Sequence, residues 1–108
     1  MDVKMIKSLA NMAVEEAEGA CKYAKLAVEN KRENPVMAEA VANLANQELT
    51  HMTTLMQVAD KMAANIHPET SDEKAHHEAV MMFLDWTKEK QSEKATMAHM
   101  HLEQYKSM

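Results

Sequence analysis

The stretch PVMAEAVANLANQELTHMTTLMQVADKMAAN, residues 35–65, decides the fold that we predict for this chain. It contains no glycine, and its one proline stands first, where a missing backbone N–H costs a helix nothing. Asn34 is suited to cap a helix that begins there. The segment Ile66-His67-Pro68-Glu69-Thr70 then interrupts the pattern. We therefore predict one long helix over residues 35–65.

The flanking segments predict two further helices. One covers residues 3–30 and ends in the polar stretch Asn30–Pro35. The other covers residues 72–105, with Ser71 or Asp72 as its cap. Both connections are short, which favours antiparallel neighbours. The expected fold is an all-α, three-helix, up-down-up bundle that leaves one quadrant of a four-helix bundle open, to be completed by dimerisation.

Composition narrows the class of protein. The 108 residues suffice for one domain, 1–108, and include only one glycine and two prolines. A formal net charge of -5 argues against nucleic acid and against an anionic membrane surface as partners. The single Cys21 cannot form a disulfide within the chain, and no apolar run is long enough to span a bilayer. We expect a cytoplasmic protein.

In the first helix, polar residues follow a seven-residue rhythm and define a solvent-facing stripe. Its members are Lys4, Ser8, Asn11, Glu15, Glu18, Lys22, Lys25 and Glu29. The opposite stripe is apolar except for Glu16, which we predict to point inward. The apolar members are Ile6, Leu9, Ala13, Ala20, Tyr23 or Ala24, and Ala27.

The second helix repeats this pattern with Glu48 and His51, which are three residues apart and therefore neighbours on one face. We assign that face to the core together with Val41, Leu44, Ala45, Met52, Leu55, Ala59 and Met62. In an antiparallel hairpin that turns near Glu33, Glu16 faces a point between Glu48 and His51. Carboxylates in such a place require a cation, a proton or water. The three side chains are therefore candidate metal ligands.

These residues resemble the first helix pair of ferritin-like and rubrerythrin-like proteins, in which a Glu, a Tyr seven residues later and a short turn precede Glu-x-x-His. The resemblance covers roughly residues 9–62. It implies that Glu16 is a terminal metal ligand, Glu48 a bridging carboxylate, His51 a terminal nitrogen ligand and Tyr23 a neighbour of the site. It also implies iron as cofactor, with other divalent metals as alternatives, and ferroxidase or peroxidase chemistry in which Glu48 and Tyr23 take part.

The third helix departs from the family pattern, because it has no Glu-x-x-His at the height of Glu48 and His51 and no fourth helix follows it. Asp85, Lys88 and Glu89 fall at the height of the site, and Glu89 is a minor candidate for a further ligand. Otherwise either two chains each supply half a site, as encapsulated ferritins do, which makes a homodimer the expected partner, or the site is incomplete and the iron chemistry of the family is lost.

Several alternatives stay open. Glu48 and His51 also suit a buried hydrogen-bonded pair, and the chain also suits a non-catalytic assembly or adaptor module. A third possibility is copper handling by the Met97–His101 segment, although most of the twelve methionines have spacings that favour core packing. We likewise expect Cys21 to be an inert residue and the pair His76-His77 to be solvated rather than bound to a metal.

Overall fold

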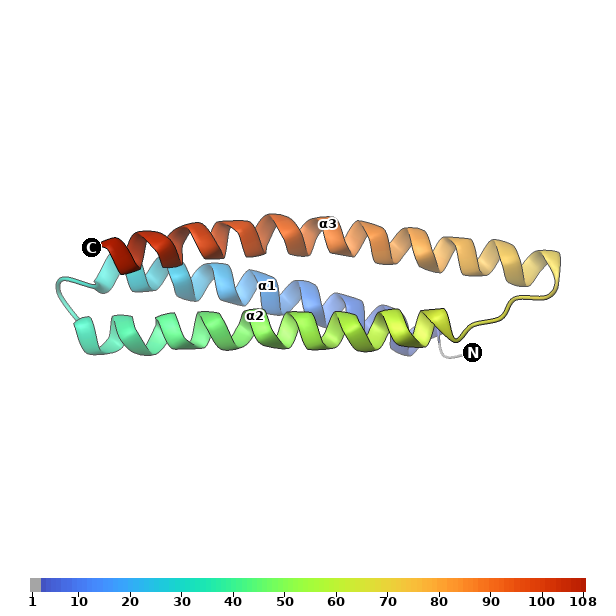
Figure 1. Cartoon of the computed structure of the whole chain (residues 1–108), viewed down its shortest axis with the longest axis horizontal. Coiled ribbons are helices and arrows are strands. Elements are labelled where there is room, and N and C mark those ends of the chain that lie inside the picture. The colour runs from blue at the N-terminus through green and yellow to red at the C-terminus, as the bar shows by residue number, and fades with distance from the viewer. Residues whose placement is uncertain (1–2) are drawn as a thin grey trace.

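The computed structural model describes residues 3–108, and they form three α-helices and no strand. The helices are α1 (Val3–Asn30), α2 (Pro35–Ala64) and α3 (Ser71–Ser107). Figure 1 shows them side by side in a rod, with α2 running opposite to α1 and α3. The Cα atoms of this rod extend over 60 × 17 × 15 Å. The predicted all-α, up-down-up helical bundle is confirmed.

Capping side chains fix where the helices begin. The Asn34 side chain accepts a hydrogen bond from the Met37 amide at 3.3 Å, and Pro35 takes the first position of α2, as predicted. The cap of α3 is Thr70, whose hydroxyl oxygen accepts from the Glu73 amide at 3.1 Å. Our assignment of this cap to Ser71 or Asp72 was therefore wrong, because the helix begins one residue earlier than predicted.

Alanine builds most of the core. The buried residues of α1 are Ile6 and six alanines, namely Ala10, Ala13, Ala17, Ala20, Ala24 and Ala27. They meet further alanines of α2, including the fully buried Ala38, Ala45 and Ala59. Side chains this short allow two helix backbones to approach closely. Met56 is the one buried methionine in residues 3–108, so the expectation that most methionines fill the core was wrong.

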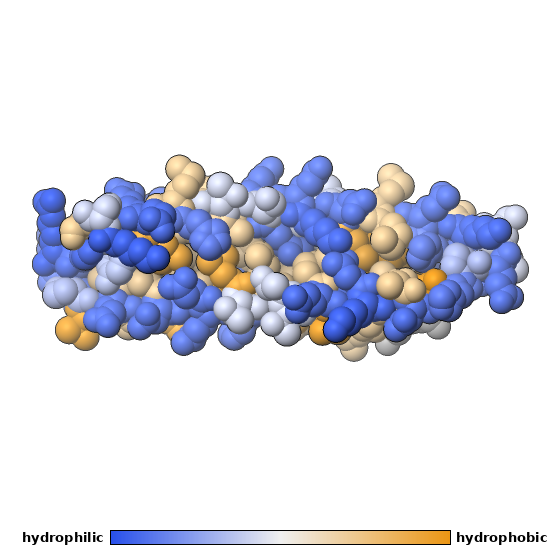
Figure 2. All heavy atoms as spheres, in the orientation of Figure 1, coloured by the Kyte–Doolittle hydropathy of each residue, from blue (hydrophilic) through white to orange (hydrophobic). Residues whose placement is uncertain are grey.

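Helix α1 lies at the centre of the bundle. It packs against both α2 and α3, whereas α2 and α3 touch each other at few positions. One of their links is the ion pair between Lys88 Nζ and Asp60 Oδ1 at 3.0 Å. Figures 1 and 2 look onto α2 and α3 with α1 behind, and hydrophobic side chains are visible between the hydrophilic rims. Within residues 3–108, no helix combines the length and the hydrophobicity that a membrane crossing requires.

Because the core consists mostly of closely packed alanines, a larger side chain there should lower the free energy of unfolding. Replacing the fully buried Ala45 with leucine should lower the free energy of unfolding by about 1–3 kcal/mol, because α1 leaves no room for the extra atoms. The matched control Ala40→Leu places the same side chain at an exposed position of α2 and should change stability by less than about 0.5 kcal/mol. Urea denaturation measures both values. Equal effects would contradict close packing at Ala45.

Candidate metal centre

Three side chains from α1 and α2 converge in what we call the Glu/Glu/His cluster, made of Glu16, Glu48 and His51. One ligand atom from each lies within 4.8 Å of the other two. Between Glu16 Oε2 and His51 Nδ1 the distance is 3.7 Å. No other group of three potential metal ligands from His, Cys, Asp and Glu comes this close in residues 3–108. The predicted height match between the two helices is therefore confirmed.

The cluster lies on the side of the α1–α2 pair that points away from α3. Glu18 faces α3, because it lines a pocket with Lys94 of that helix. Glu16 is two residues away and thus about 200° round the helix. In α2, His51 lies about 180° from Asp60, the residue that pairs with α3. We call this side the outer face.

This placement corrects the prediction that the three residues point into the core. Glu16 is at the edge of the α1–α2 interface with 26% of its side chain exposed, and His51 is 57% exposed. Helix α2 is rotated about its own axis relative to our prediction. Leu44 is therefore exposed, whereas Leu49 and Met56, which we had left out of the α2 core, are buried. The physical cause is the position of α3, which packs on the opposite side of α1 and leaves the outer face uncovered.

Electrostatics at the cluster favour a cation. Glu16 Oε2 is buried and has no hydrogen-bond partner, and its distance to His51 exceeds that of a hydrogen bond. Glu48 brings a second carboxylate to the same place. A buried anionic oxygen without a donor is costly, and a divalent ion ligated by both carboxylates and the imidazole would relieve that cost.

Gly19 makes room for Glu48, a role that the sequence analysis missed. A Cβ atom at position 19 would lie 3.2 Å from Glu48 Oε2, closer than an ordinary contact. Glycine inside a helix costs roughly 0.5–1 kcal/mol relative to alanine. The available signal was that the only glycine of the chain stands in the middle of a helix with an otherwise strong helix-forming composition.

The remaining candidates lie apart from the cluster. Tyr23 is half-buried and packs against an alanine-rich core cluster, two helical turns or about 10 Å along the axis from Glu16. In α3, Asp85, Lys88 and Glu89 are exposed, and Lys88 pairs with Asp60. The suggestion that Glu89 adds a ligand was therefore wrong, since α3 packs on the other side of α1.

An open pocket of about 240 Å³ gives access to the cluster. Glu16 and His51 line it together with Met12, Thr54 and Leu55.

Comparisons with models of known families, with curated proteins and with solved structures find no match for this chain. The chemistry of the cluster itself therefore carries the functional proposal.

Because Glu16 Oε2 is buried without a hydrogen-bond donor, we predict that the cluster weakens the metal-free protein. Replacing Glu16 with methionine, which has a similar shape and no charge, should raise the free energy of unfolding in the presence of a chelator by about 1 kcal/mol. Glu15→Met, at the exposed neighbouring position, should leave it within about 0.5 kcal/mol. Denaturation in urea measures both. A clear loss of stability in Glu16→Met alone would show that the carboxylate supports the fold.

Proposed function

We propose that this chain is a ferritin-like metal-binding protein whose Glu/Glu/His cluster is half of a di-iron carboxylate site. The observation that carries the proposal is the convergence of Glu16, Glu48 and His51 within 4.8 Å at an otherwise uncovered face. Two carboxylates and one imidazole are three ligands, too few to hold two metal ions. Di-iron bundles use four carboxylates and two histidines from four helices.

A second copy of the chain supplies the missing half. Two α1–α2 pairs that meet through their outer faces around a twofold axis form a four-helix unit with two Glu16, two Glu48 and two His51. This doubled set matches a Glu from each of two helices and a Glu-x-x-His from each of the others. We had expected dimerisation to fill the open quadrant of a four-helix bundle, without saying which helices border it. In the structure α2 and α3 touch at few positions, and the cluster does not lie on that side.

The outer face has the side chains that such an interface needs. In α1, the residues Met5, Met12, Gly19 and Leu26 are spaced by seven, and Met5, Met12 and Leu26 are 47%, 44% and 39% exposed. In α2, Leu44, His51 and Val58 have the same spacing, with Leu44 and Val58 exposed by 37% and 43%. Apolar residues that recur at every seventh position are typical of helix–helix interfaces. The cluster lies midway along both stripes.

The chemistry follows from the ligand types. Glu16, Glu48 and His51 of both chains would hold two ferrous ions close together, and the carboxylates would neutralise much of their charge. Oxidation of two ferrous ions would deliver two electrons, which together with two protons from solvent would reduce one molecule of hydrogen peroxide to two molecules of water. The role of the protein is to hold the two ions where the two clusters meet. Iron is the substrate of this oxidation, and the ferric product is stored or released.

The exposed apolar stripes also suit a second candidate function, a non-catalytic assembly module that keeps the helical scaffold without redox chemistry. The two functions differ in their response to metal. An assembly module forms the same oligomer with or without a divalent ion, whereas a shared metal site couples oligomer stability to metal concentration.

Metal binding should stabilise the protein through the cluster. Manganous ion at about one hundred times its dissociation constant should add roughly 2.7 kcal/mol to stability, visible as a rise in melting temperature. Glu48→Gln should abolish the rise, and Gly19→Ala should reduce it while leaving the metal-free helix at least as stable. Glu15→Gln is the control. Equal responses of Glu48→Gln and the wild type would exclude the proposed site.

Because the proposed dimer completes the metal site, a variant that no longer associates should also lose metal binding. A lysine at Met12 places a charge in the proposed interface without removing a ligand, so Met12→Lys should be monomeric by sedimentation and should lose most of the stabilisation by manganese. Met82→Lys puts the same charge on an exposed position of α3 and should behave as the wild type. A monomeric Met12→Lys variant that keeps full metal binding would show that one chain suffices.

A further inference from the structure

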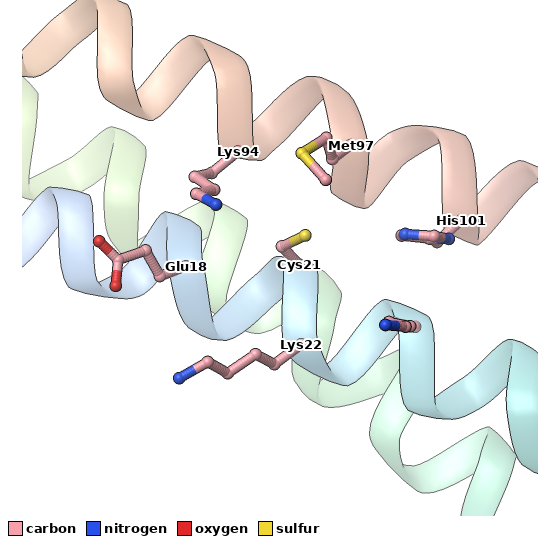
Figure 3. Close-up of a pocket in the computed structure, with 7 residues that line it drawn as sticks. Glu18, Cys21, Lys22, Lys94, Met97 and His101 are labelled. Carbon is pink, nitrogen blue, oxygen red and sulfur yellow. The ribbon is translucent and has the colours of Figure 1, made fainter.

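A second pocket lies on the opposite side of α1, between α1 and α3, and soft donor atoms line it. Its volume is about 440 Å³, and its walls include Cys21 from α1 and Met97 and His101 from α3. In Figure 3 the Cys21 thiol points from α1 toward α3, and Met97 and His101 point from α3 back toward α1. We call these three residues the soft-donor set.

The geometry of α3 places its two donors together. Met97 and His101 are four residues apart and thus lie on one face of the helix, one turn from each other. Both also line an adjacent pocket with Met100 and Gln104. Met97 is 44% exposed and Met100 is 67% exposed, so neither fills the core as the sequence had suggested. Their thioethers are accessible to a ligand.

We propose that the soft-donor set binds cuprous ion, with the Cys21 sulfur, the Met97 sulfur and the His101 imidazole as ligands. Thiolate and thioether sulfur are soft ligands that favour Cu(I), zinc and iron–sulfur clusters over harder ions such as manganous ion. This site is independent of the Glu/Glu/His cluster, whose oxygen and nitrogen ligands suit ferrous and manganous ions and lie on the other side of the α1 helix.

The charges round the pocket favour a monovalent ion over a divalent one. Lys22, Lys25 and Lys94 line the same pocket, with Glu18 as the one carboxylate. Cu(I) replaces the proton of the Cys21 thiol, so its binding releases one proton and leaves the net charge of the pocket unchanged. A zinc or manganous ion bound in the same way adds one positive charge among three ammonium groups. The pocket therefore discriminates against such ions.

This site differs from a copper site built by the Met97–His101 segment alone. That segment also contains His99, but His99 lines a different pocket, against Asn46 and Thr50 of α2. A site that needs Cys21 joins two helices that are far apart in sequence, and it forms only in the folded protein. Copper bound by the segment alone requires no residue of α1.

The test is an anaerobic Cu(I) titration of the full chain against a colorimetric chelator such as bicinchoninate. We expect one tightly bound Cu(I) per chain, and X-ray absorption should show sulfur ligands. Cys21→Ser, Met97→Leu and His101→Gln should each weaken binding by about tenfold or more, because loss even of residues that merely support metal ligands commonly costs that much. His99→Gln and Met82→Leu, on other parts of α3, should bind as the wild type does.

Crossed controls separate this proposal from the carboxylate site. Glu48→Gln should keep Cu(I) binding, and Cys21→Ser should keep the response to manganese, so that each site can fail without the other. Circular dichroism of Cys21→Ser should show unchanged helicity, since serine has nearly the size of cysteine. Cu(I) binding that Cys21→Ser leaves unaffected, or no binding in competition with the chelator, would overturn the proposal.

Discussion

The close packing of alanines along α1 is the constraint on which the rest of the structure depends. Six of its seven buried residues are alanines, so the neighbouring helices approach its backbone with little side chain between them. Long side chains are left for the edges of the interfaces. At such an edge the carboxylates of Glu16 and Glu48 meet His51. Because Gly19 has no Cβ atom, it leaves space there for the carboxylate of Glu48.

A thin alanine core also explains the two faces of α1. On one side the partly buried carboxylates of the cluster and the exposed His51 lie midway along two stripes of apolar residues, and on the other side Cys21, Met97 and His101 line a pocket among lysines. Both sets of ligands lie at helix edges, where side chains reach solvent and are still held by a rigid backbone. A core of larger residues would separate the helices and disperse both sets.

Much of the fold follows from local sequence. Pro35 and the Ile66–Thr70 break define the helices to within one or two residues at most ends, because proline position and capping residues act locally. The height of Glu16 against Glu48 and His51 follows from the hairpin turn and the constant rise of the helix.

The local sequence does not determine which side of α2 is buried. Alanine gives a weak hydrophobic signal, and the larger Leu44 and Met62 shifted the predicted core toward the wrong edge of the helix. The position of α3 decides the outcome, and no local pattern specifies it. Cys21 and His101 were likewise missed as neighbours because the parallel packing of α1 and α3 joins segments eighty residues apart.

Our proposal is that two chains share one di-metal site through the outer face. Its most direct test is the crystal structure of the protein grown with manganous ion, with the metal located by anomalous diffraction. We expect two ions between two α1–α2 pairs, held by Glu16, Glu48 and His51 of both chains. Ions bound elsewhere, or a dimer that meets through α3 and leaves the cluster free of metal, would contradict it.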